Sequence, residues 1–171
     1  MTEWLVQHGD ILDVQAEVLV CSANPYLTLS GGVGGALRQK YGGAMQERLQ
    51  EYLTECKVKY VEPGTVVAID GSGTPYTMVL HAVAVDAFYD SSVSLVSELV
   101  VRSLAIANEL GAKSIALPAL ATGYGKLAMS QFASALVPLV QTDFGVRRAT
   151  VCLRHDADAE VVRAAISPRN A

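Results

Sequence analysis

The sequence predicts a three-layer α/β fold, in which helices cover both faces of one central sheet. Apolar runs typical of strands alternate along the chain with segments whose apolar residues recur at helical spacing. Several strand-like runs are apolar at consecutive positions, as expected for strands covered on both faces. With 171 residues and 51% hydrophobic content, the chain is expected to form one domain over residues 1–166 and a disordered tail at 167–171.

Six strands are expected from runs rich in apolar and β-branched residues. They lie at residues 3–6, 17–21, 65–69, 76–83, 114–117 and 149–153. Residues 71–75, Gly-Ser-Gly-Thr-Pro, separate the third and fourth of these runs and are typical of a hairpin connection.

Helices are expected where apolar residues recur every three or four positions. The longest such series is interrupted by Gly42 and Gly43, which should break or kink the helix. The four series are Leu37, Tyr41, Met45, Leu49, Leu53 and Cys56; Val96, Val100, Leu104 and Ala107; Phe132, Leu136 and Val140; and Val162 with Ile166.

Charge and composition argue against several classes of protein. The formal net charge of −4 does not suit a protein that grips duplex nucleic acid, and Arg147-Arg148 is the only adjacent basic pair. There is no amino-terminal signal pattern and no apolar run near 20 residues, so neither export nor a membrane partner is expected. Three cysteines without Cys-x-x-Cys spacing are expected to be reduced thiols in the cytoplasm.

A strand-like run ending at Asn24 is followed by a glycine-rich segment, residues 30–37, at the start of a helical pattern. Backbone N–H groups at a helix N-terminus attract anions, and glycines let a phosphate approach them closely. The segment lacks the third glycine of the dinucleotide fingerprint, and Gly125-Lys126 lacks the Ser or Thr of a P-loop. The pattern therefore favours either an unusual phosphate site or simply a tight strand-to-helix connection.

Four motifs, in order along the chain, resemble those of one family. They are Gly-Asp-Ile at 9–11, Cys-Ser-Ala-Asn at 21–24 with Ser-Gly-Gly-Val at 30–33, Leu-His-Ala-Val at 80–83, and residues 114–125 with Ala-Thr-Gly-Tyr-Gly at their end. Together they resemble the macro domain, a module that binds ADP-ribose. The resemblance implies a mixed, mostly parallel sheet, and ADP-ribose or an ADP-ribosylated protein as partner.

The resemblance also implies the site residues. Asp10 with Ile11 would read the adenine amino group, Asn24 would touch the distal ribose and position a catalytic water, and Arg154 would stack on the base where relatives carry an aromatic residue. The two phosphates would lie against two loops, formed by Gly31, Gly32, Val33 and Gly34 and by Ala121, Thr122, Gly123 and Tyr124. Thr122 would also offer its hydroxyl.

Three functions remain open at this point: a binding module, an ADP-ribosyl hydrolase, and a degenerate scaffold for another nucleotide or a protein. Gly34 stands where one hydrolase branch of the family has a catalytic aspartate, although related viral members hydrolyse ADP-ribosyl esters with a small residue there. Cys21 and Ser30 replace a family asparagine and glycine. His81 is expected to be a hydrogen-bonded core residue, and no cofactor or metal is expected.

Overall fold

Six strands form a single mixed sheet in the computed structural model, which describes residues 1–167. The strand order is β1-β6-β5-β2-β4-β3, and only β3 runs antiparallel to its neighbour. The sheet is therefore mostly parallel, as the sequence resemblance implies. The strands are β1 (Glu3–His8), β2 (Val18–Ala23), β3 (Val66–Asp70), β4 (Met78–Val83), β5 (Ser114–Leu117) and β6 (Arg148–Leu153).

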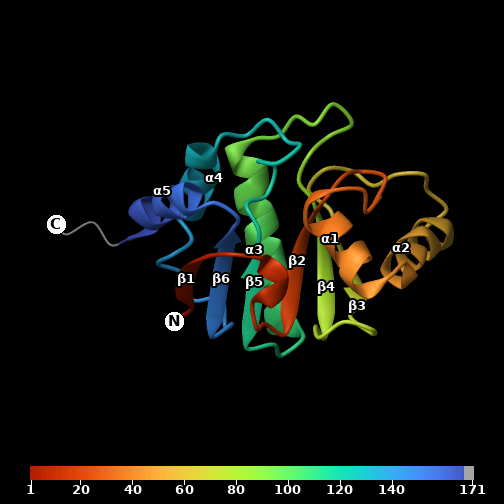
Figure 1. Cartoon of the computed structure of the whole chain (residues 1–171), viewed down its shortest axis with the longest axis horizontal. Coiled ribbons are helices and arrows are strands. Elements are labelled where there is room, and N and C mark those ends of the chain that lie inside the picture. Colours follow the sequence, from red (N-terminus) through yellow and green to blue (C-terminus); the bar gives the residue numbers. More distant parts are fainter. Residues whose placement is uncertain (168–171) are drawn as a thin grey trace.

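Helices cover both faces of this sheet, so the three-layer prediction is confirmed (Figure 1). One apolar core joins α3, α4 and α5 to one face of the sheet, and a second joins α1, α2 and the short 3-10 helix η1 to the other. The helices are η1 (Ile11–Asp13), α1 (Gly32–Tyr41), α2 (Ala44–Glu55), α3 (Val93–Glu109), α4 (Met129–Leu136) and α5 (Asp156–Ile166).

Most predicted elements lie within two residues of the observed ones, and the exceptions have clear causes. The break at Gly42 and Gly43 is confirmed, because α1 ends at Tyr41 and α2 begins at Ala44. The prediction that Val140 belongs to a helix is wrong. Helix α4 ends at Leu136, since Pro138 has no N–H to continue the hydrogen-bond ladder.

The last helix, α5, ends at Ile166, one residue before the end of the described part of the chain. Ser167, which the sequence assigns to a tail, caps α5 through a hydrogen bond from its N–H to the Arg163 carbonyl (2.9 Å). The rest of the expected tail, residues 168–171, lies outside the described residues. No helix among residues 1–167 is both long and apolar enough to span a membrane.

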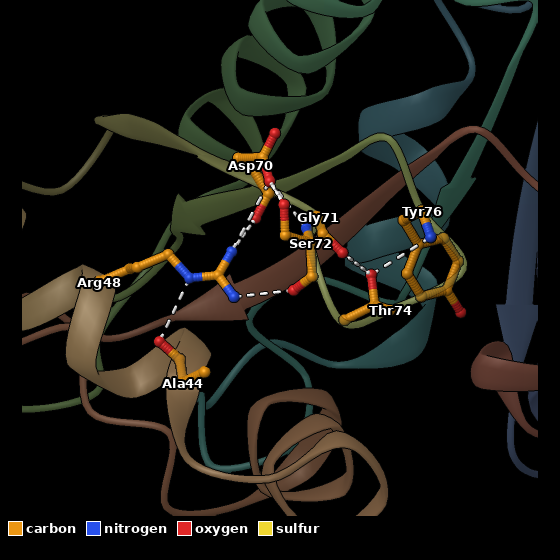
Figure 2. A network of polar contacts seen from close by, with 7 residues as sticks. All are labelled: Ala44, Arg48, Asp70, Gly71, Ser72, Thr74 and Tyr76. Atoms are coloured by element: carbon orange, nitrogen blue, oxygen red, sulfur yellow. Dashed lines mark hydrogen bonds and ion pairs between the residues drawn. The ribbon is translucent and has the colours of Figure 1, made fainter.

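The turn between β3 and β4 is fixed to α2 by one arginine (Figure 2). The guanidinium of Arg48 donates to the carbonyls of Asp70 (2.5 Å) and Ser72 (2.8 Å). Hydrogen bonds from Ser72, through its hydroxyl first and then its N–H, lower the pKa of the Asp70 carboxyl. The predicted hairpin connection is confirmed, and it is anchored at the end of the sheet away from the carboxyl ends of the parallel strands.

Candidate functional site

A cleft of about 630 Å³ lies at the carboxyl ends of the five parallel strands. Loops that follow β1, β2, β4, β5 and β6 all contribute to its lining. In open α/β sheets, ligands bind at this edge, because the loops from neighbouring strands converge there. In Figure 1 the loops after β4 and β5 meet above this edge of the sheet.

Every residue that the sequence assigns to the site lines this cleft. The strand order places the loop of β1 at one end, followed by the loops of β6, β5, β2 and β4. The sequence-predicted residues found there are Asp10 and Ile11 after β1, Arg154 after β6, Ala121, Thr122, Gly123 and Tyr124 after β5, and Asn24, Gly31, Gly32, Val33 and Gly34 after β2. That these residues hold a ligand stays a prediction.

The first turn of α1 brings free backbone donors to the cleft. Gly31 is the N-cap residue and forms no side-chain capping bond, and Gly32 has a φ of 55°. The N–H groups of Gly31, Gly32, Val33 and Gly34 donate to no other group within residues 1–167. A helix N-terminus with unpartnered donors carries a partial positive charge, so this turn attracts an anion.

The loop between β5 and α4 supplies a second set of donors. It closes through a hydrogen bond from Leu127 N–H to the Ala121 carbonyl (3.1 Å), and Ala121 has a positive φ of 62°. The backbone N–H groups of residues 122–125 have no acceptor in the described part of the chain. The hydroxyl of Thr122 donates to the Ala119 carbonyl (2.8 Å), so, contrary to our expectation, its proton is not free for an anion.

The two loops touch each other across the cleft. A Cβ atom placed on Gly31 would lie 2.5 Å from Cε2 and 2.6 Å from the hydroxyl oxygen of Tyr124. Only glycine leaves room for this contact. The Tyr124 ring therefore crosses over the β2–α1 loop, and it does so while 72% exposed.

The side chain of Asn24 holds the shape of its own loop. Its Oδ1 accepts from the N–H groups of Tyr26 (3.0 Å) and Thr28 (3.3 Å), and its Nδ2 donates to the Thr28 carbonyl (3.2 Å). An amide oxygen has two lone pairs and the nitrogen two protons, so one N–H remains. Asn24 can donate one further hydrogen bond, to a ribose hydroxyl or to the oxygen of a water, but it cannot accept a proton.

The end of the cleft formed by the loops after β1 and β6 carries charged side chains. Asp10 caps η1, since its Oδ1 accepts from Leu12 N–H (2.9 Å), and its Oδ2 is left to accept from a ligand. The exposed Arg154 has no carboxylate partner among residues 1–167. Burial, with smaller effects from the charges of Asp10 and Asp13, raises the pKa of Cys152 to about 11, so this thiol is neutral at pH 7.

Two titratable side chains lie side by side beneath the loop between β2 and α1. Cys21 on β2 pairs in register with His81 on β4, and both are fully buried. Burial raises the pKa of Cys21 to about 12 and lowers that of His81 to about 4. Contrary to our expectation, neither ring nitrogen of His81 has a hydrogen-bond partner within residues 1–167. The pair is thus neutral and supplies neither a nucleophile nor a base.

Other residues line the cleft that the motifs did not indicate. Tyr89 follows β4, and His155 with Asp158 lies at the start of α5. A signal for Tyr89 existed, because residues 86–90, Asp-Ala-Phe-Tyr-Asp, directly follow the strand predicted at residues 76–83. No group of three potential ligands among His, Cys, Asp and Glu gathers as a metal site would within residues 1–167.

Comparison with known proteins gives the family. The Macro domain profile matches residues 20–136. The chain belongs to the macro domain family. This macro domain is 33% identical over 150 residues to a macro domain-containing protein of Streptomyces nogalater, covering 83% of the chain and 79% of that relative.

Solved structures agree on the fold of this macro domain. It superposes on the Oceanobacillus iheyensis macrodomain with ADP at a TM-score of 0.86 and 21% identity, covering 94% of this chain and 88% of that one. It matches the Trypanosoma brucei macrodomain in complex with ADP-ribose at a TM-score of 0.79 and 19% identity, covering 96% and 69%. The predicted fold class is confirmed.

Proposed function

We propose that this macro domain binds ADP-ribose, either free or attached to a protein, in the cleft at the carboxyl ends of its parallel strands. The observation that carries the proposal is the pair of donor sets facing one cleft: the N–H groups of residues 31–34 and those of residues 122–125. Two adjacent anion-binding loops suit a diphosphate, with one phosphate against each loop.

The order of the loops supports a ligand with a base at one end and a sugar at the other. Four strand spacings separate β1 from β4, which is about 19 Å. Asp10, at the β1 end, has a carboxylate oxygen to accept from an exocyclic amine, and Arg154 beside it offers a flat guanidinium to a base. Asn24, near the β4 end, offers one N–H to a sugar hydroxyl.

Solved macrodomains point the same way, since that of Oceanobacillus iheyensis was crystallised with ADP and that of Trypanosoma brucei in complex with ADP-ribose. The substitution at Cys21 argues little for a degenerate site. This residue is fully buried below the loop and is not part of the cleft lining, so its side chain presents nothing to a ligand.

The three free cysteines also support a cytoplasmic location, where they would stay reduced.

Calorimetric titration with ADP-ribose, ADP and AMP tests the proposal. Micromolar binding of ADP-ribose, tighter than that of AMP, is expected, because AMP reaches only one phosphate loop. A titration in which ADP-ribose gives no heat, on protein shown to be folded by its melting curve, would overturn the proposal and favour a scaffold for another partner.

Hydrolysis of an ADP-ribosyl linkage is the second candidate function, and the remaining N–H of Asn24 is the observation that favours it. This N–H can orient a water, but no carboxylate or imidazole lines the β4 end of the cleft within residues 1–167. The proton acceptor would be a phosphate oxygen of the substrate, so slow turnover is expected.

The test follows release of ADP-ribose from a protein modified on acidic side chains. Asn24→Asp keeps the two hydrogen bonds that Oδ1 accepts but has no N–H, so it should bind weakly and release nothing. If the wild-type protein releases nothing while it binds ADP-ribose, the function is binding alone.

A further inference from the structure

The loop between β4 and α3, residues 84–92, is irregular but firmly held. The Asp86 carboxylate accepts from the N–H groups of Phe88 (2.8 Å) and Asp90 (2.9 Å), and the Asp86 N–H donates to the Asp90 carbonyl (3.0 Å). These bonds close a small ring of backbone around Tyr89. The position of the Tyr89 side chain is therefore set by the loop and not by packing in the core.

Tyr89 occupies a strained backbone conformation. Its φ of 63° lies in the left-handed region, which costs free energy for a residue with a Cβ atom. Strain of this kind persists only where the surroundings impose it, and it gathers at binding sites. Tyr89 lines the cleft, whereas its neighbour Phe88, which is 75% exposed, does not.

Two contacts join this loop to the β5–α4 loop. The rings of Tyr89 and Tyr124 lie 6.3 Å apart between centroids at an interplanar angle of 44°, and Lys126 Nζ lies 2.7 Å from Asp90 Oδ1. Strand β2 lies between β4 and β5, so both contacts pass over the loop that follows β2. The cleft is thus walled beyond Asn24 by an aromatic pair drawn from two different loops.

The strand order places Tyr89, which follows β4, at the end of the cleft opposite Asp10, past the donor loops that follow β5 and β2. We infer that Tyr89 is a specificity-determining residue: its ring packs against the sugar attached to the second phosphate and lets the cleft distinguish ADP-ribose from ADP. The inference rests on the proposed function and names the part of the ligand that this side chain reads. Aromatic rings suit this role because they bury a large apolar area with few rotatable bonds.

The experiment titrates ADP-ribose and ADP into the wild-type protein and three variants. Tyr89→Ala removes the ring, Tyr89→Phe keeps it without the hydroxyl, and Phe88→Ala is the matched control on the same loop. Tyr89→Ala should weaken ADP-ribose binding about tenfold and leave ADP binding within about twofold, whereas Phe88→Ala should change neither. Tyr89→Phe should retain most of the preference, since packing and not the hydroxyl carries it.

The outcomes separate the two proposals. If the wild-type protein binds neither nucleotide, the proposed function fails and the inference fails with it. If the wild-type protein binds ADP-ribose and Tyr89→Ala loses affinity for both ligands equally, or for neither, only the inference is overturned. Melting curves of all variants show whether an equal loss of affinity for both ligands comes from a disordered loop. That outcome would also overturn the role of the Tyr89 ring in distinguishing ADP-ribose from ADP.

Discussion

Replacing His81 tests whether burial keeps this imidazole neutral. The folded protein holds the pKa of His81 at about 4, against an ordinary value of 6.5, and the cause is burial. The unfolded chain therefore binds a proton as the pH falls below 6.5, while the folded chain does not until the pH approaches 4. The stability that depends on a neutral His81 is therefore fully present above pH 6.5 and is lost progressively as the pH falls from 6.5 to 4.

The loss can be estimated from the difference between the two pKa values. Linkage gives a decrease in the free energy of unfolding of about 2 kcal/mol at pH 5 and about 3 kcal/mol at pH 4. His81→Leu has nothing to protonate and is close in size, so it should remove this decrease. At neutral pH it should also raise the free energy of unfolding by about 1–2 kcal/mol, because two unpartnered nitrogens leave the core.

Urea unfolding between pH 7 and pH 5, followed by the fluorescence of the only tryptophan, Trp4, gives the free energies. His155→Gln serves as the control, since His155 is exposed and the variant should keep the wild-type pH dependence. Parallel loss of stability in the wild-type protein and in His81→Leu would refute the reasoning. It would mean that His81 finds a partner or water when it is charged.

Three further predictions concern the cleft. Asp10→Asn should keep the η1 cap and the melting temperature, because Oδ1 still accepts from Leu12 N–H. It should weaken ADP-ribose binding by about 1–3 kcal/mol in calorimetry, because the amide NH2 turned toward adenine donates a hydrogen bond and does not accept one. Unchanged affinity would remove Asp10 from the site. Gly125→Ala should abolish ADP-ribose binding, because its Cβ atom would lie 2.1 Å from the Ala121 carbonyl oxygen. Gly123→Ala is the control and should melt like the wild-type protein, because its Cβ atom would have no other atom within 4 Å. Equal melting and binding of the two variants would contradict this prediction. Gly32→Glu has room for its side chain and should cost about 1–2 kcal/mol of stability, because residue 32 has a positive φ. The variant should also lose ADP-ribose binding, because the negative carboxylate repels the negative phosphate. Retained binding would exclude a phosphate at this position.

Local patterns in the sequence were sufficient to predict most of the fold. Consecutive apolar positions in 18–21, and in 79–83 apart from His81, predict strands covered on both faces, and both runs are buried on both sides of the sheet. The end of α4 was predicted wrongly although the sequence carried a signal for it, since Pro138 argues against a helix through Val140. By contrast, β1 extends to His8 because it pairs with β6 up to Leu153, and such pairing across the chain has no local signal.

The candidate site was predictable to the extent that motifs mark loops. The β2–α1 and β5–α4 loops both carry glycines at crowded positions, such as Gly31 beneath Tyr124, so the sequence indicates these loops directly. Tyr89 was missed although its loop follows a predicted strand, because its place on the cleft depends also on the strand order, which puts β4 next to β2. The unpartnered nitrogens of His81 were equally unpredictable, since a hydrogen bond depends on the neighbours that the fold brings close.

The contact between Tyr124 and Gly31 also bears on how fast a ligand gets in and out. A diphosphate that lies beneath the ring reaches its place only when the side chain has swung aside, so each binding event includes a rotation. With the ring 72% exposed, this rotation takes nanoseconds or less, far shorter than the interval between encounters with a dilute nucleotide. If the proposed diphosphate lies beneath it, the ring therefore leaves the association rate to diffusion and, by covering the ligand, lengthens the residence time.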